Sequence, residues 1–192
     1  SAMARFIYDL ISRMWAEAVI PPEWEVGIVV PIPKKGDLQD PDNYRGITLL
    51  TSVYKLFAKV VTGRLYVIAE HEDLLCREQA GFRSREECVS QATTLYEVAR
   101  RRMVKGHGTY MVFLDFEKAY DRVPHEALLR KLESVGIGGR LLTVIRAMYS
   151  NPHLSVRTGS ARTKAVPYRR GVRQGCPCSP ILFDLYINDL LR

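Results

Sequence analysis

The chain has 192 residues, of which 47% are hydrophobic and 26% are charged. That composition is typical of a globular protein with a real core, and no apolar run is long enough to cross a membrane. The four cysteines lack the spacing of a zinc site, so we expect reduced thiols in an intracellular protein. A net charge of +7 favours a polyanionic partner, usually nucleic acid, over a solvated basic surface without a partner.

Amphipathic helices are predicted over much of the chain, because apolar residues recur there at helical spacing. The N-terminal pattern does not fit a secretory signal, and Ser1-Ala2-Met3 resembles a scar left by removal of a tag, so these three residues are left out of the expected fold. The expected helices cover residues 5–19, 51–70, 86–104, a segment from Pro124 to a stop at Gly136, residues 139–149, and a segment capped by Ser179 with Pro180 in its first turn.

Extended segments alternate with these helices. Trp24 to Pro33 is rich in strand-forming residues, and Leu154–Thr158 and Arg162–Tyr168 read as a hairpin around Gly159 and Ser160. The chain shows no internal repeat and no low-complexity linker. The mixture of helices and strands predicts an α+β fold.

The segment from Tyr110 to Asp121 is the one around which the other predictions are organised. Its apolar run, Met111–Leu114, predicts a buried strand that stops at a carboxylate, Asp115. A buried strand that delivers an acid to its own end can hold a metal-binding carboxylate rigidly. The alternative is that Asp115 caps the helix that follows, and this segment alone leaves both interpretations open.

Two groups of basic residues are candidates for contact with phosphates. The turn Lys34-Lys35-Gly36-Asp37 is followed after a short loop by Arg45, so these cations lie on loops beside a strand. The alternative for this group is a polar surface loop. Arginines are also locally dense at residues 100–102 and again over residues 169–173.

Five motifs in order resemble a reverse transcriptase (RNA-directed DNA polymerase) of the non-LTR, LINE-type retrotransposon family. They are Pro31-Ile-Pro-Lys-Lys-Gly-Asp, Asn43-Tyr-Arg-Gly-Ile-Thr-Leu-Leu, Gln79-Ala-Gly-Phe-Arg, Phe113-Leu-Asp-Phe-Glu-Lys-Ala-Tyr-Asp and Gly171-Val-Arg-Gln-Gly-Cys-Pro-Cys-Ser-Pro. The resemblance implies the fingers and palm portion of a right-hand polymerase. Residues 4–108 would be an N-terminal helix and fingers, and residues 109–192 a partial palm.

The resemblance assigns catalytic roles to the central segment. Asp115 would be the first metal-binding carboxylate, and Phe116 would offer its backbone carbonyl to the same Mg²⁺, with Mn²⁺ as an alternative ion. Tyr120 would be a steric gate against a ribose 2′-hydroxyl, the alternative being an aromatic side chain packed into the core. Glu117 and Lys118 are interpreted as solvated.

The resemblance also implies contacts with deoxynucleoside triphosphates, an RNA template and a DNA primer. The expected nucleotide-binding residues are Lys34 or Lys35, Arg45, Tyr120, Gln174 and Gly175. The residues expected to follow nucleic-acid phosphates are Arg83, Arg169, Arg170 and Arg173. Cys178 stands where the family commonly has leucine, a small apolar change that does not alter these assignments.

One expected motif does not occur, namely the hairpin with two adjacent aspartates that follows the Ser179-Pro180 helix in the family. We therefore expect a piece truncated before that hairpin, inactive alone, with an exposed palm surface that favours a homodimer. The parent protein is expected in the nucleus. Two alternatives are a non-catalytic nucleic-acid-binding or self-associating module of a truncated or domesticated retroelement, and an RNA-templated RNA polymerase, against which Tyr120 argues.

Overall fold

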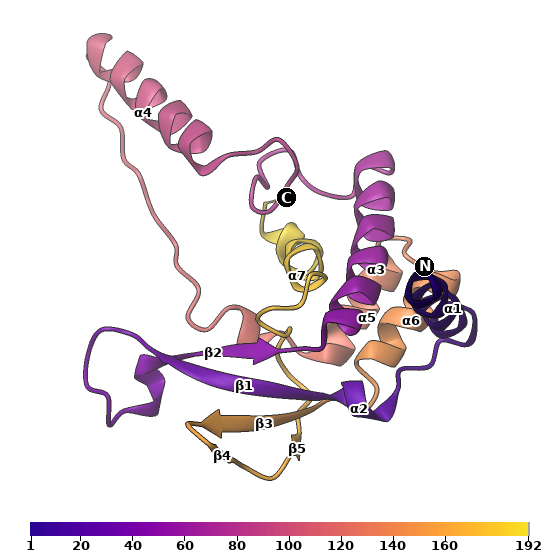
Figure 1. The fold of residues 1–192 in the computed structure, drawn as a ribbon. Coiled ribbons are helices and arrows are strands. Elements are labelled where there is room, and N and C mark those ends of the chain that lie inside the picture. The colour runs from indigo at the N-terminus through magenta and orange to yellow at the C-terminus, as the bar shows by residue number, and fades with distance from the viewer. Residues whose placement is uncertain (192) are drawn as a thin grey trace.

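The computed structural model describes residues 1–191, which form a mixed α+β fold with a small sheet below a group of helices (Figure 1). The helices are α1 (Ala2–Glu17), α2 (Pro22–Glu25), α3 (Ser52–His71), α4 (Cys88–Val104), α5 (His125–Ser134), α6 (Gly139–Met148) and α7 (Ser179–Ile187), with short 3₁₀ helices at Pro41–Asn43, Tyr120–Arg122 and Asn188–Leu191. The strands are β1 (Val26–Pro33), β2 (Tyr44–Leu49), β3 (His153–Thr158), β4 (Ala161–Arg162) and β5 (Val166–Pro167).

Strand β1 lies at the centre of the sheet. It pairs antiparallel with β2 on one side and parallel with β3 on the other, and β3 pairs antiparallel with both β4 and β5. The hairpin expected around Gly159 and Ser160 is confirmed, since Thr158 pairs with Ala161. Strands from both sides of the expected boundary at residue 108 thus share one sheet. The boundary itself stays a prediction, and residue 192 lies outside the described residues.

The hydrophobic core lies between α3 and the helices α5, α6 and α7. Helix α3 begins after Thr51, whose side chain accepts a hydrogen bond from the Tyr54 N–H at 3.3 Å. One face of α3 is then buried, as its helical spacing predicts. Each large apolar side chain buried there stabilises the fold by roughly 1.5–3 kcal/mol. The buried residues of that face are Tyr54, Phe57, Ala58, Val61, Leu65 and Ala69.

The expected helix ends are confirmed in part. Helix α5 stops before Gly136, whose φ of +89° is a left-handed conformation that glycine adopts without strain. Helix α7 carries Pro180 in its first turn, as expected, but the predicted serine cap is wrong. The Ser179 hydroxyl instead donates to the Arg173 carbonyl at 2.8 Å, and Cys178 occupies the N-cap position without a capping hydrogen bond from its side chain. Helix α1 also includes Ala2 and Met3, which had been left out of the expected fold.

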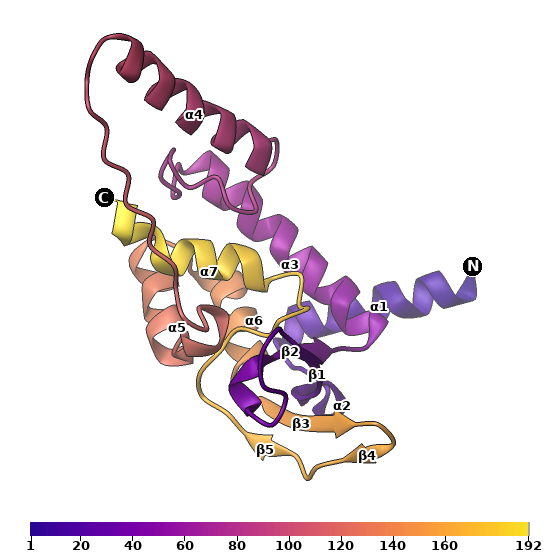
Figure 2. The same cartoon turned by 90° about the vertical axis from the view of Figure 1, so that its left-hand side faces the viewer.

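Helix α4 and the extended segment after it project away from the body of the molecule (Figures 1 and 2). The helix is confirmed, but none of its residues is buried. The strand expected at Met111–Leu114 is wrong: that segment is irregular, and Leu114 is 87% exposed. Both edges of β1 are already occupied by β2 and β3, and within residues 1–191 no other strand lies beside residues 111–114. The apolar run therefore has no partner to bury it.

Candidate functional site

The β1–β2 hairpin brings two of the predicted cations to one face. Ile32 is paired with Arg45, and the Lys34 N–H continues the ladder by donating to the Asn43 carbonyl at 2.7 Å. Side chains that are paired or two residues apart share a face of a sheet, so Lys34 and Arg45 lie together at the loop end of the hairpin. Lys35 follows on the opposite side. All three side chains are exposed.

The turn at Gln174 and Gly175 is docked on β2 by backbone contact. The Thr48 N–H donates to the Gln174 carbonyl at 2.7 Å. Gly175 has a φ of +113°, and a Cβ atom at that position would lie 2.7 Å from the Thr48 carbonyl oxygen. Glycine is thus required here by both conformation and space. The Gln174 side chain reaches the other way and donates to the Asp121 carboxylate at 3.2 Å.

These contacts surround a cavity of about 240 Å³ between β2, the residue 170–174 turn and the end of the central segment. A pocket that encloses a drug-sized ligand typically measures roughly 300–1,000 Å³, so this one holds part of a nucleotide at most. Segments that are far apart in sequence therefore meet at one place. The lining residues are Val29, Gly46, Thr48, Asp121, Leu154, Tyr168, Arg170, Gly171, Val172, Arg173 and Gln174.

Tyr120 is half-buried against the last helix rather than freely exposed. Its ring packs on Phe183, with centroids 4.9 Å apart, and on Phe82 at 6.4 Å. Its hydroxyl is buried and has no hydrogen-bond partner among residues 1–191. Burial raises the pKa of Tyr120 to about 12, and the nearby Asp184 carboxylate adds to the shift. This packing suits either a gate held in place from behind or an aromatic side chain of the core.

Asp184 is a buried carboxylate beside Tyr120 that the sequence analysis did not single out. It is 2% exposed, and its Oδ1 accepts a hydrogen bond from the Gln79 amide at 2.8 Å, while Oδ2 has no partner in the described part of the chain. Burial raises the pKa of Asp184 to about 6, although the Gln79 bond and the charge of Arg83 oppose the shift. The available signal was a charged residue within the apolar face of α7.

Arg173 is buried, which contradicts its expected role on nucleic-acid phosphates. It is 5% exposed and donates to the Tyr168 hydroxyl at 2.8 Å and to the Trp24 and Glu25 carbonyls at 3.3 and 3.0 Å. Its guanidinium also lies 5.5 Å from the Tyr54 ring centroid. Arg173 therefore joins elements of the fold and has little surface to offer a ligand.

Arg83, another residue expected on phosphates, is also engaged within the chain. It forms a two-pronged ion pair with Glu70, at 2.7 and 3.1 Å, and donates to the Cys76 carbonyl. Arg169 and Arg170, in contrast, are exposed. Of the four arginines, these two are the exposed ones, and their contact with nucleic acid stays a prediction.

Comparison with known proteins supplies the family. The sequence profile of the family described as reverse transcriptase (RNA-dependent DNA polymerase) matches residues 32–192. The chain belongs to the reverse transcriptase family. This confirms the resemblance of the five motifs, and non-LTR retrotransposon proteins are prominent among the relatives.

Three relatives show how this reverse transcriptase segment compares with longer proteins. A Pol polyprotein of the type-1 retrotransposable element R2 of Popillia japonica is 31% identical and matches 90% of this chain and 24% of the relative. A 149 kDa protein of transposon TX1 of Xenopus laevis is 31% identical over 96% of this chain and 14% of its own length. An RNA-directed DNA polymerase from the mobile element jockey of Drosophila melanogaster is 26% identical over 97% of this chain and 20% of its own length. The chain thus spans at most about a quarter of these relatives.

A solved structure with the same fold is that of telomerase from Candida tropicalis, truncated from its C-terminal domain. It superposes with a TM-score of 0.53, is 16% identical, and covers 96% of this chain and 43% of the telomerase chain. This likeness confirms the expected α+β polymerase fold of the reverse transcriptase segment. No helix among residues 1–191 is both long and apolar enough to pass through a membrane.

The reverse transcriptase motif around Asp115 does not by itself form a metal site. Asp115 lies in the exposed, irregular segment after Leu114, as does Phe116, which is 51% exposed. No group of three His, Cys, Asp or Glu side chains suited to a metal ion occurs within residues 1–191. One carboxylate is a poor site for the octahedral coordination of Mg²⁺, so the residues described do not fit a complete magnesium centre.

The raised pKa of Asp184 makes the stability of the chain depend on pH. The folded chain keeps this proton up to about pH 6, whereas the unfolded chain releases it near the ordinary value of 3.8. The folded state binds more protons between these values, so its free energy of unfolding falls as pH rises through that window. Asp184→Asn removes the effect, and its stability relative to the native chain is expected to rise by on the order of 1–3 kcal/mol from about pH 4 to about pH 7.

Urea unfolding of both proteins at the two pH values measures this difference. Asp9→Asn, which removes an exposed carboxylate from α1, is the control and should show no comparable change. A difference between Asp184→Asn and the native chain that does not vary with pH would contradict the assignment.

Proposed function

We propose that this chain is the nucleotide- and template-binding part of an RNA-directed DNA polymerase. Its natural ligands would be a deoxynucleoside triphosphate and an RNA template with a DNA primer. The observation that carries the proposal is the convergence of β2, the Gln174-Gly175 turn and Asp121 around one cavity. Family membership supports the reaction class, and relatives such as the jockey protein are named for that activity.

The hairpin would supply the grip on the triphosphate. Lys34 and Arg45 share a face at its loop end, so two cations can meet neighbouring phosphate groups. The register favours Lys34 over Lys35 for this role. Gln174 would face the base and sugar from the other side of the cavity, and Gly175 would hold the Gln174 turn close against the Thr48 carbonyl. Arg169 and Arg170 would contact backbone phosphates of the template and primer.

The reaction would be transfer of a nucleotide to a primer 3′-hydroxyl with release of pyrophosphate. Asp115 and the Phe116 carbonyl are the proposed ligands that this segment offers to Mg²⁺, or to Mn²⁺ in its place. The residues described do not complete that site, so the contribution we assign to this chain is binding and orientation of the substrates. Tyr120 would exclude a ribose 2′-hydroxyl from the bound nucleotide, with Phe183 packed behind it.

Binding of dATP and of a fluorescent RNA–DNA primer-template tests the proposal directly. Lys34→Ala and Arg45→Ala are each expected to weaken dATP binding about tenfold, the equivalent of losing one charge-assisted hydrogen bond of roughly 1.5 kcal/mol. Lys35→Ala is the matched control, because Lys35 is the neighbouring exposed lysine. It should change the affinity for dATP by less than about twofold, as expected for a solvent-screened surface charge. Equal affinities for all three variants would refute the assignment of the hairpin.

Titration with the primer-template over a series of salt concentrations tests the proposed contact with nucleic acid. Each phosphate contact adds roughly 0.7–0.9 to the slope of log affinity against log salt. A steep slope that is reduced in the double variant Arg169→Ala, Arg170→Ala supports contact through these exposed arginines. Binding of primer-template without any binding of dATP would favour the alternative of a non-catalytic nucleic-acid-binding module.

The chain alone is expected to extend no primer, because among the described residues Asp115 belongs to no group of three side chains that could hold a metal ion. A primer-extension assay with Mg²⁺, and separately with Mn²⁺, measures this. Asp115→Asn serves as the control for contaminating polymerases. Extension by the native chain that is absent from Asp115→Asn would show that the chain completes a metal site, and would overturn this expectation.

Self-association is the second property that we propose, and the exposed apolar side chains of α4 and the following segment favour it. Val89, Met103 and Phe113 are 73%, 71% and 79% exposed. A surface of this kind marks an interaction site. We expect light scattering at micromolar concentrations to give a dimer mass, and Phe113→Asp with Met103→Asp to give a monomer. A monomeric mass for the native chain over that range would contradict a homodimer.

A further inference from the structure

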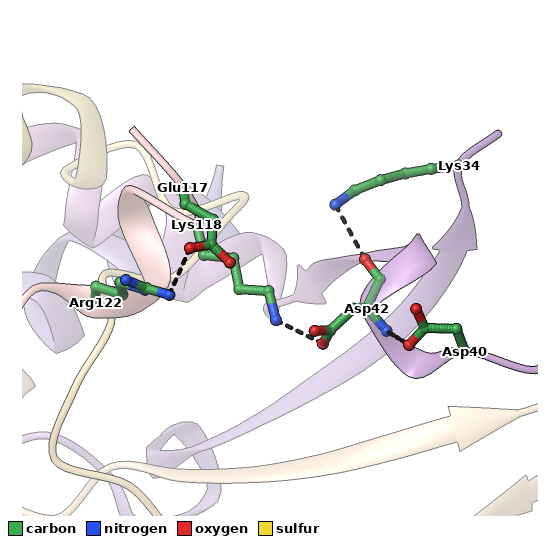
Figure 3. Close-up of polar contacts among 6 residues, drawn as sticks. All are labelled: Lys34, Asp40, Asp42, Glu117, Lys118 and Arg122. Atoms are coloured by element: carbon green, nitrogen blue, oxygen red, sulfur yellow. Dashed lines mark hydrogen bonds and ion pairs between the residues drawn. The ribbon is translucent and has the colours of Figure 1, made fainter. Parts of the chain in front are cut away.

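Asp42 lies between two lysines that come from different parts of the chain. The Lys118 ammonium is 2.6 Å from the Asp42 Oδ1 atom, and the Lys34 ammonium donates to the Asp42 backbone carbonyl at 3.4 Å (Figure 3). The bond to Lys118 lowers the pKa of Asp42 and raises that of Lys118. Lys118 was expected to be solvated, and the structure instead gives it a specific anionic partner.

The backbone around Lys118 directs its side chain toward Asp42. Lys118 has a φ of +50°, a left-handed conformation that costs a lysine roughly 1 kcal/mol. The turn that follows is held by two N–H groups, those of Asp121 and Arg122, which donate to the Lys118 carbonyl at 3.0 and 3.2 Å. Strained conformations persist where surrounding contacts determine them, and they often occur at binding sites.

The Asp42–Lys118 pair joins the same two segments that line the cavity. Asp42 precedes β2, which contributes Gly46 and Thr48, and Lys118 begins the turn that contributes Asp121. Lys34, the hairpin cation placed for a triphosphate, touches the same aspartate. Two ammonium groups therefore meet at one residue, that of Lys118 at the Asp42 carboxylate and that of Lys34 at the Asp42 backbone carbonyl.

We propose that Lys118 is a further triphosphate-binding residue, and that in the chain without nucleotide Asp42 occupies the place of a phosphate oxygen. This inference rests on the proposed nucleotide binding. An exposed ion pair contributes little stability, because water screens it and two side chains must be held in place. A triphosphate carries several anionic oxygens and can bridge Lys34 and Lys118 at once, so it displaces a single carboxylate.

The alternative is that the ion pair only tethers the central segment to the hairpin. The two cases predict different directions for the change in ligand affinity of the two variants. If the pair is only a tether, Lys118→Met and Asp42→Asn break the same bond and alter ligand binding in the same direction. If Lys118 binds phosphate and Asp42 competes with it, the first variant weakens binding and the second strengthens it.

Calorimetric titration with inorganic tripolyphosphate, and separately with dATP, tests the inference on the whole chain. Lys118→Met is expected to weaken both affinities about tenfold, and Asp42→Asn to strengthen both by about threefold. Lys118→Arg keeps the charge and should restore most of the affinity. The controls are Lys164→Met and Asp9→Asn, which make the same charge changes at exposed positions away from the cavity and should leave both affinities within about twofold.

Two results would overturn the inference while leaving the proposed function in place. One is a change of the same sign in Lys118→Met and Asp42→Asn. The other is a loss of affinity for tripolyphosphate and dATP in Lys118→Met that is no larger than the loss in Lys164→Met, while Lys34→Ala still weakens dATP binding. A native chain that binds neither tripolyphosphate nor dATP would refute the proposed function and this inference together. Far-UV circular dichroism of each variant confirms that the helices are retained.

Discussion

The turn that begins at the buried Arg173 is the constraint on which the candidate site depends. The Arg173 guanidinium reaches the carbonyls of Trp24 and Glu25, just before β1, and the next residue presents its own carbonyl to Thr48 of β2. A buried cation must find acceptors, and an unsatisfied one costs more than an ordinary hydrogen bond contributes. This demand joins the C-terminal motif to the N-terminal hairpin.

These hydrogen bonds hold the walls of the cavity together, whereas the segment that carries Asp115 has no comparable connection to the sheet. The walls of the cavity are held by sheet pairing and by the Gln174–Thr48 backbone bond. Asp115, in contrast, follows an apolar run that pairs with no strand in the described residues. The fold thus fixes the walls of the proposed binding cavity by sheet pairing and backbone hydrogen bonds, whereas Asp115 lies in an irregular segment outside the sheet.

Sequence reasoning succeeded where local patterns decide the outcome. The helical spacing in α3, the glycine stop after α5 and the Gly159-Ser160 turn were all predictable, because each depends on residues close in the chain. It failed where a partner far away in sequence decides. An apolar run predicts a strand but not its neighbour, and in the described residues no strand pairs with residues 111–114.

The candidate site shows the same division. The motifs pointed to Gln174 and to the hairpin, and the fold brings Gln174 together with Gly46 and Thr48 of β2 at one cavity, while their role in binding stays a prediction. Charge alone placed Arg173 on the surface, although its acceptors are backbone carbonyls nearly 150 positions earlier in the chain. The contact between Asp42 and Lys118 was likewise beyond local patterns, because 76 positions separate the two residues.

The measurement that tests the central claim most directly is a map of backbone amide chemical shifts during titration with dATP. The account predicts saturable changes concentrated at residues 34 and 45–48 of the hairpin, in the turn of residues 118–122 and at residues 170–174, which include residues that line the cavity. The Thr48 amide should respond strongly because it is bonded to Gln174. Changes centred instead on the apolar groove between α1 and α3, which Trp15 and Leu56 line, or no saturable change at all, would contradict the account.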